Sequence, residues 1–240
     1  MAALATDVSA RPAAATPTVT IAYPGTPKGT PKLDDLAAFR AMGFTAITWT
    51  GGGSTVPLRK LAASVDLQVV DRADATIKAA GAANEMRAAA WRAIIRGARV
   101  LLIDPGQPHG TGFTSASGDP QPWVRPAKAL ASEIGSNPNL IDALRRGPGV
   151  QILPPVPKGL DITLLDGDRA WVLVATSTAK TELHAVAKLP VNVPYALWVS
   201  LIDGSGLSML REDSGPRWTL TIAPGEAKVY VIDKPHKLVN

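Results

Sequence analysis

The chain contains no cysteine, which removes disulfides, thiol nucleophiles and zinc–thiolate sites together. No apolar run approaches the roughly 20 residues that a membrane-spanning helix needs, because charges and prolines interrupt the longest candidates. The N-terminus also lacks a basic stretch followed by an apolar one, so it is not a convincing signal peptide. We therefore expect a soluble or peripheral protein, whose compartment the sequence leaves open.

A strong excess of either charge is missing as well. The 25 Lys and Arg residues and 20 Asp and Glu residues give a net charge of +5, and the basic residues are scattered. The densest basic pair, Arg145-Arg146, closes a predicted helix, where cations favour the helix dipole. These features argue against nucleic-acid binding. The diffuse positive charge remains compatible with an acidic protein partner or an anionic membrane face.

The first half of the chain alternates strand-like and helix-like segments. Strands are predicted within 18–25, 45–53, 67–74 and 99–104, and helices within 32–43, 57–64, 84–97, 126–135 and 138–146. Such alternation favours a parallel sheet with helical crossovers, because a tight turn cannot join parallel neighbours. We assign residues 18–148 to this βα domain. The Ala- and Pro-rich residues 1–17 before it are interpreted as a tail that is either flexible or bound to a partner.

The composition changes near residue 150. Residues 149–159 form a Pro- and Gly-rich linker, and six strand candidates separated by turn sequences follow, without a convincing helix. The second half, residues 160–240, is therefore predicted to be a small antiparallel β-sandwich. The predicted fold class is α/β plus all-β.

Three segments together resemble the glycoside hydrolases that combine a TIM barrel with a C-terminal β-sandwich. They are "LDDLAAFRAMGFTAITW", "EMRAAAWRAIIRGARVLLID" and "LTIAPGEAKVYVID", which are similar to an early helix and strand, the unit that closes the barrel, and the last hairpin of the sandwich. The resemblance implies a barrel of eight strands and about 250 residues. Only four strands are predicted before the sandwich, so the resemblance implies a truncated, half-barrel βα domain that lacks the middle strands.

Carboxylates determine whether such a scaffold can cleave a glycosidic bond, because that reaction needs two of them roughly 5–10 Å apart. None of the five glutamates follows a predicted strand of the first half. Glu85 is interpreted as an acid at a helix start, and the others as solvated surface: Glu133, Glu182, Glu212 and Glu226. Asp71, Asp74 and Asp104 do follow predicted strands, where ligand sites gather. They are the catalytic candidates, although Asp is equally common in turns.

Other residues suggest binding rather than catalysis. Trp49 at a strand end and Trp123 in a loop are candidates for stacking on a sugar, while Trp91 is expected in the core. His109, in a Gly-rich loop near Asp104, is a further binding candidate that could move protons or ligate a metal. It has no His partner at metal-binding spacing, so no metal site is predicted. The glycine run after Trp49 lacks the Lys and Ser or Thr of a phosphate loop. No cofactor is predicted.

Two functions are consistent with these residues. The one we favour is a non-catalytic structural or interaction subunit of a larger assembly, including docking on the periphery of a membrane complex, because middle strands and strand-end glutamates are absent. It predicts that residues 1–17 and 105–122 lie against other chains. The alternative is a glycoside hydrolase or carbohydrate-binding protein that uses Asp71, Asp74 and Asp104 with Trp49.

Overall fold

The computed structural model describes residues 18–23, 32–50, 54–79, 82–104, 122–145, 150–151, 156–188, 198–200, 206–207 and 217–234. The N-terminal segment 1–17, most of the 105–122 loop and His109 lie outside these ranges. Within them, no helix is both long and apolar enough to cross a bilayer.

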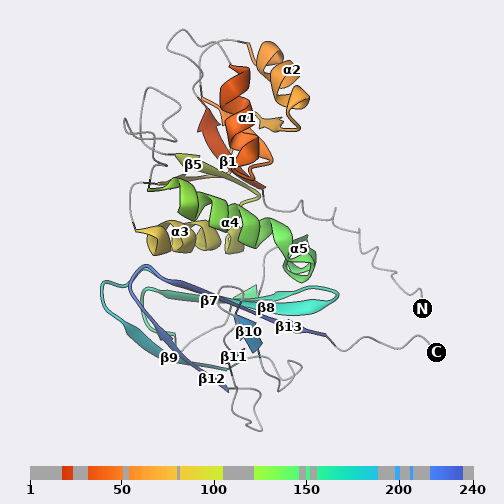
Figure 1. Cartoon of the computed structure of the whole chain (residues 1–240). Coiled ribbons are helices and arrows are strands. Elements are labelled where there is room, and N and C mark those ends of the chain that lie inside the picture. The colour runs from red at the N-terminus through yellow and green to blue at the C-terminus, as the bar shows by residue number, and fades with distance from the viewer. Residues whose placement is uncertain are drawn as a thin grey trace, which may run out of the picture.

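The first half is a parallel sheet with helices, as the sequence predicted. Its elements are, in chain order, β1 Thr18–Tyr23, α1 Leu33–Ala41, β2 Ala46–Trp49, α2 Val56–Ser64, β3 Gln68–Val70, β4 Ala75–Lys78, α3 Ala83–Ile95, β5 Val100–Asp104, α4 Val124–Ser136 and α5 Pro138–Arg145. Gly43 and Gly97 adopt positive φ just after α1 and α3, the backbone conformation that ends a helix and favours glycine. Figure 1 shows α1 and α2 at one end of the molecule and α3 and α4 on the other side of the strands.

The break between α4 and α5 follows from Asn137-Pro138, as expected. Proline disfavours a helical conformation in the residue before it and is well suited to the first position of a helix. The Asn137 side-chain oxygen accepts hydrogen bonds from the backbone N–H groups of Asn139 and Leu140, both at 3.0 Å. Asn137 therefore ends one helix and caps the next.

The parallel sheet has five strand segments rather than the four predicted, in the order β3-β2-β1-β5-β4. The strand predicted within residues 67–74 is present as β3, which ends at Val70, but the separate strand β4, which begins at Ala75, was not predicted. These consecutive strands occupy opposite edges of the sheet. Val69 on β3 pairs with residue 47 on β2, which pairs with residue 21 on β1, then 103 on β5, and finally Ile77 on β4. The two edge residues at the same level of the sheet are therefore eight positions apart in the sequence (77 − 69).

This topology requires a strongly curved sheet. In a flat sheet, β3 and β4 would be four strand spacings apart, or about 19 Å, and Ala75 would also lie about 10 Å behind Val70 along the strands. The five-residue step from Val70 to Ala75 spans at most about 18 Å even when fully extended. Residues 71–74 can bridge the two edges only if the sheet curls so that its edges approach each other.

The second half forms two antiparallel sheets. Its strands are β6 Val150–Gln151, β7 Leu160–Asp166, β8 Ala170–Ser177, β9 Leu183–Lys188, β10 Trp198–Ser200, β11 Gly206–Leu207, β12 Arg217–Ile222 and β13 Ala227–Asp233. A six-stranded sheet has the order β11-β10-β13-β8-β7-β6, and β9 pairs with β12. All six predicted strands are present. β6 lies within the predicted linker 149–159 and pairs with β7, so part of that linker belongs to the sheet.

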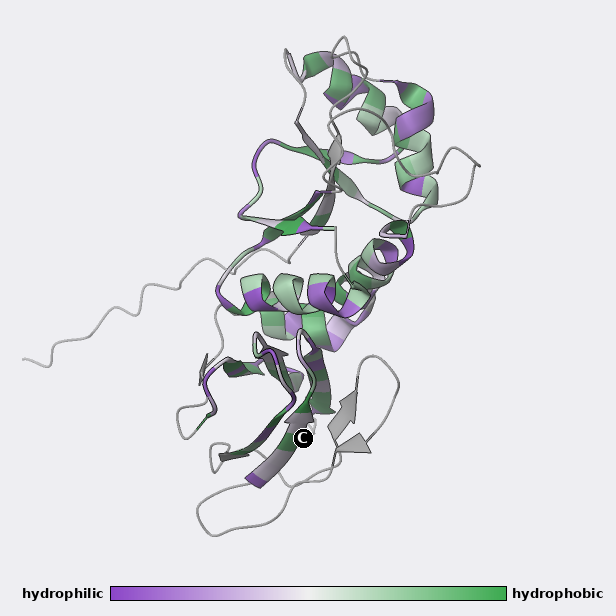
Figure 2. Cartoon of the chain, turned by 90° about the vertical axis from the view of Figure 1, so that its left-hand side faces the viewer, coloured by the Kyte–Doolittle hydropathy of each residue, from purple (hydrophilic) through white to green (hydrophobic). Residues whose placement is uncertain are grey.

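The six-stranded sheet is a central layer, and its strands β7, β8 and β13 are buried on both faces. On β8, Val172 and Val174 face the core shared with the helices, whereas Leu173 and Ala175 face a second core. Trp218, which is fully buried in β12, belongs to that second core, so the β9–β12 pair covers the far face of the sheet. Helices α3 and α5 contact β8 and β13 on the near face (Figure 1). Figure 2 shows that the coloured strands of this layer are largely hydrophobic.

Candidate functional site

The carboxyl ends of the parallel strands form one rim of the βα half. Trp49 ends β2, Asp71 follows β3, Lys78 ends β4 and Asp104 ends β5. In parallel α/β sheets this rim is where ligand sites form. Two of the three aspartate candidates are therefore on the same rim.

Asp71 is engaged by a basic side chain. The Arg59 guanidinium on α2 donates to both carboxylate oxygens, at 2.5 and 2.6 Å. Both side chains are exposed, so the pair contributes little stability, but it neutralises the carboxylate. A catalytic role for Asp71 would require this pair to open.

Asp74 lies at the opposite rim. It does not follow a strand but precedes β4, and its Oδ2 accepts the backbone N–H groups of Arg99 at 2.7 Å and Val100 at 2.9 Å, where β5 begins. Asp104 is the last residue of β5, and four residue steps along a strand separate Val100 from Asp104 by about 13 Å. The structure does not bring Asp74 and Asp104 together, because β5 lies between them along its length. Asp74 serves as a cap.

Asp104 is half-buried, and its backbone oxygen accepts the Ala79 N–H at 2.8 Å. Its register partner on β4 is Lys78. On the neighbouring strand, the residue paired with Asp104 is therefore a lysine and not a second acid. Asp71 and Asp104 remain the one pair of aspartate candidates on a common rim.

The two tryptophan candidates are only partly available to a ligand. Trp49 and Trp123 are each half-buried and pack against the core shared by the sheet and helices. Trp91 is fully buried, as predicted. Among the residues that the structure describes, no group of three or more His, Asp or Glu side chains is placed to hold a metal ion.

The sequence interpretation of Glu133 was wrong. Its side chain is only 12% exposed and forms a two-pronged ion pair with Arg87, with Nε–Oε2 and Nη2–Oε1 distances of 2.7 and 2.5 Å. The Trp91 indole N–H also donates to Glu133 Oε1 at 3.1 Å. A signal was present in the sequence: Glu133 directly precedes Ile134 at the border of the apolar face of α4. The sequence could not supply the partner, because Arg87 is 46 residues away on α3.

Arg87 extends this ion pair to the second half, since its Nη1 also donates to the backbone oxygen of Ala227 in β13. Farther along α3, the Arg92 guanidinium donates to the backbone oxygen of Ser177 in β8 at 3.0 Å. Burial is the main cause of a lowered pKa for Arg92; Asp161 opposes that shift and Arg96 adds to it. Charged side chains of α3 therefore fasten the βα half to the antiparallel sheet.

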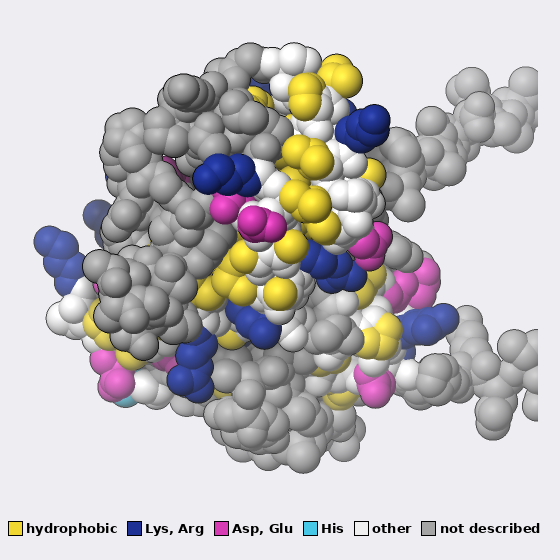
Figure 3. Space-filling model, turned by 45° about the horizontal axis from the view of Figure 1, so that its top comes forward, with side chains coloured by type: hydrophobic (Ala, Val, Ile, Leu, Met, Phe, Trp, Pro, Cys, Tyr) yellow, Lys and Arg dark blue, Asp and Glu magenta, His cyan; other side chains and the backbone are white. Residues whose placement is uncertain are grey.

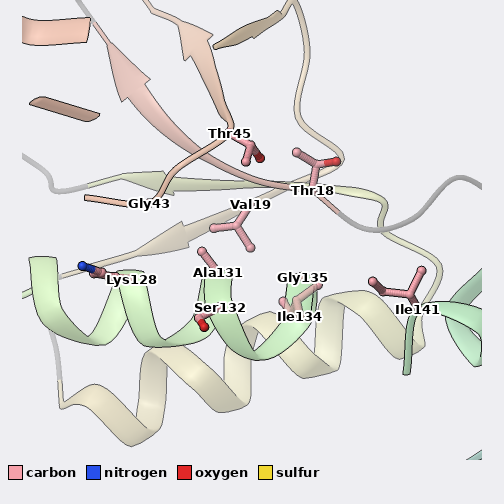
Figure 4. A pocket seen from close by; sticks show the side chains of 10 residues that line it. All are labelled: Thr18, Val19, Gly43, Thr45, Lys128, Ala131, Ser132, Ile134, Gly135 and Ile141. Carbon is pink, nitrogen blue, oxygen red and sulfur yellow. The ribbon is translucent and has the colours of Figure 1, made fainter. Parts of the chain in front are cut away.

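A hollow of about 440 Å³ lies at the rim opposite Asp104, between α4 and the amino ends of β1 and β2. Its lining is mostly apolar, with one ammonium group, and was not anticipated from the sequence. Ten residues line it (Figure 4): Thr18, Val19, Gly43, Thr45, Lys128, Ala131, Ser132, Ile134, Gly135 and Ile141.

No protein-family model matches this sequence. No curated protein matches it either. Solved structures that it resembles include glycoside hydrolases, as the sequence indicated. They include an α-amylase from Geobacillus thermoleovorans in complex with acarbose (11% identity, TM-score 0.45, 85% of this chain and 43% of that one). A putative α-galactosidase from Bacteroides fragilis is similar at 10% identity and a TM-score of 0.44, over 91% of this chain and 62% of that one. A GH30 endoxylanase from Clostridium papyrosolvens is similar at 12% identity and a TM-score of 0.40, over 90% of this chain and 56% of that one.

This chain spans less than two thirds of the length of each of these enzymes. Likeness at this level concerns the arrangement of the elements and assigns neither a substrate nor an activity.

Proposed function

We propose that this chain is a non-catalytic structural or interaction subunit of a larger assembly, built on a shortened glycoside-hydrolase-like scaffold. One observation carries the proposal: of the three aspartates that could act at the strand ends, Asp74 caps the opposite rim and Asp71 is held by Arg59. Glycosidic cleavage requires two carboxylates about 5–10 Å apart, one acting as acid and the other as base or nucleophile.

The proposed scaffold is a contracted barrel followed by a β-sandwich. The eight-residue advance around the parallel sheet equals the shear of an eight-stranded TIM barrel, and β3 and β4 would be two halves of one strand in a ring of four βα units. The shared core between the six-stranded sheet and the β9–β12 pair supports a sandwich. Closing the ring would remove exposed sheet edges without help from a tail or another chain.

The rim offers a surface suited to protein contact. Leu33 and Val56 begin α1 and α2, and they are 45% and 71% exposed. Helices that return antiparallel to the strands start at the strand carboxyl ends, so both side chains belong to the same rim as Trp49. Figure 3 shows hydrophobic side chains among Lys, Arg, Asp and Glu on the face of α1 and α2. Exposed aliphatic side chains within a charged surround are typical of interaction sites.

The direct test is purification from the native source under gentle conditions, followed by size-exclusion chromatography. A subunit elutes with fixed partners in constant ratio, whereas elution of the chain alone would contradict the proposal. The double variant Leu33→Asp/Val56→Asp should then release the chain from its partners. Both substitutions place an acid in a first helical turn, where the dipole favours it, so folding is preserved. Ala63→Asp, on an exposed position of α2, is the matched control and should leave the assembly intact.

The alternative function is a glycoside hydrolase or carbohydrate-binding protein, supported by the common rim of Asp71, Asp104 and Trp49. A panel of aryl glycosides distinguishes the two. We expect hydrolysis no faster than the buffer blank. Turnover that disappears in Asp104→Asn would overturn the non-catalytic proposal, and a sugar-dependent shift of tryptophan fluorescence would favour carbohydrate binding.

A further inference from the structure

We propose that the hollow between α4 and the amino ends of β1 and β2 binds a small amphipathic carboxylate of the medium-chain fatty-acid type. The carboxylate would lie at Lys128 and the alkyl chain would run toward Ile141. The volume of about 440 Å³ falls within the roughly 300–1,000 Å³ typical of small-molecule sites. This site is at the rim opposite Asp104, so it is independent of the proposed function.

The floor of the hollow is one stripe of α4. Lys128, Ala131, Ser132 and Gly135 follow each other at positions i, i+3, i+4 and i+7, which share a helix face, and they extend over about 10 Å. The small residues at three of these positions keep the space open. A Cβ atom built on Gly135 meets nothing within 4 Å. Val19, which is buried, lines the opposite wall (Figure 4).

Charge selects the kind of ligand. Lys128 is exposed, and no carboxylate among the described residues pairs with it; the lining contains no acid at all. In Figure 4, Lys128 stands at one end of the hollow and Ile141 at the other. The side chains between them are those of Val19, Ala131 and Ile134 and the hydroxyl-bearing Thr18, Thr45 and Ser132. A cation at one end of an apolar slot complements a ligand with a single negative head and an apolar body.

Other ligand classes fit less well. A sugar presents hydroxyl groups in all directions and would leave them unpaired against Val19, Ala131 and Ile134. A phosphate group is normally held by several cations or by a row of backbone N–H groups, and this lining contributes one ammonium group. One ammonium group, with the Ser132 hydroxyl one helical turn along α4, suffices for a single carboxylate head.

The test compares decanoate with decanol by isothermal titration calorimetry on the full chain. We expect saturable binding of decanoate with one site per chain. Lys128→Gln should weaken decanoate about two- to fivefold, the range for an exposed ion pair, and leave decanol unchanged. Lys60→Gln, on an exposed position of α2, is the matched control and should alter neither ligand.

Gly135→Leu tests the location. The leucine side chain would fill the open space, and leucine favours helix over glycine, so the variant should fold at least as stably while losing more than tenfold in affinity for both ligands. Three results would overturn the proposal: no saturable binding, unchanged binding in a folded Gly135→Leu, or an equal effect of Lys128→Gln on acid and alcohol. Binding seen only after removal of residues 1–17 would also overturn it, because that segment would then be the natural occupant.

Discussion

Breaking the Arg87–Glu133 pair is the most informative perturbation of the fold. Glu133→Leu leaves the Arg87 charge without its carboxylate in a place where that side chain is 14% exposed, and it deprives the Trp91 N–H of its acceptor. Removing one partner of a buried ion pair costs about 3–5 kcal/mol. Total stabilities of domains are about 5–15 kcal/mol, so this single change should remove a large part of the stability.

The reverse single variant and the double variant complete the cycle. Arg87→Met strands the Glu133 carboxylate and should cost a similar amount. Arg87→Met/Glu133→Leu buries neither charge and retains side-chain volume, but it leaves the Trp91 N–H without its acceptor and the Ala227 carbonyl without its Arg87 donor. It should therefore cost less than either single variant, each of which also leaves a buried charge without its partner. The double variant is therefore expected to be more stable than either single variant, with a coupling energy of several kcal/mol.

Urea unfolding followed by tryptophan fluorescence measures these free energies. Arg96→Ala is the control, because it removes an ion pair with Asp161 from the same helix where the Arg96 side chain is 66% exposed. That change should cost less than about 1 kcal/mol. A loss below about 1 kcal/mol for Glu133→Leu, or a double variant as unstable as the sum of the singles, would refute the assigned role of the pair.

Three further outcomes can be measured. Asp74→Ala should destabilise the protein by about 1 kcal/mol in urea unfolding, because two backbone N–H groups lose a common acceptor at an exposed site. Asp74→Asn keeps a side-chain oxygen and should recover most of that loss. No loss of stability in either variant would show that the cap is unimportant. Gly167→Ala should lower the melting temperature by calorimetry more than most surface changes, because the added Cβ would lie 2.8 Å from the Cα of Ala143 in α5; an unchanged melting temperature would contradict that close approach. If the proposed non-catalytic function is correct, Asp71→Asn and the unaltered protein should both hydrolyse aryl glycosides no faster than the buffer blank. Because the pair with Arg59 is exposed, the substitution should shift stability by less than about 1 kcal/mol, and a larger loss would mean that this pair is structural.

Local patterns predicted most of the elements correctly. Helical spacing, Asn137-Pro138 and glycine stops placed the five helices of the described residues, and β-branched runs placed six strands of the second half, but β6 and β11 were not predicted. β4 was missed because "ATIK" is short and follows β3 after only residues 71–74, so the sequence alone suggests one strand. Whether residues 67–78 form one strand or two depends on which neighbours they pair with, and those neighbours are distant in sequence.

The sequence by itself determined the alternation of strands and helices, the switch to antiparallel strands near residue 150, and the absence of thiol chemistry. Only the tertiary structure decided which aspartates share a rim, because β5 separates Asp74 from Asp104 whereas their positions near strand ends look alike in the sequence. It also decided that Glu133 is buried, since a carboxylate at the border of an apolar face can be paired or solvated. Arg87 determines that the Glu133 carboxylate is paired, and the packing of α3 on α4 brings Arg87 beside it.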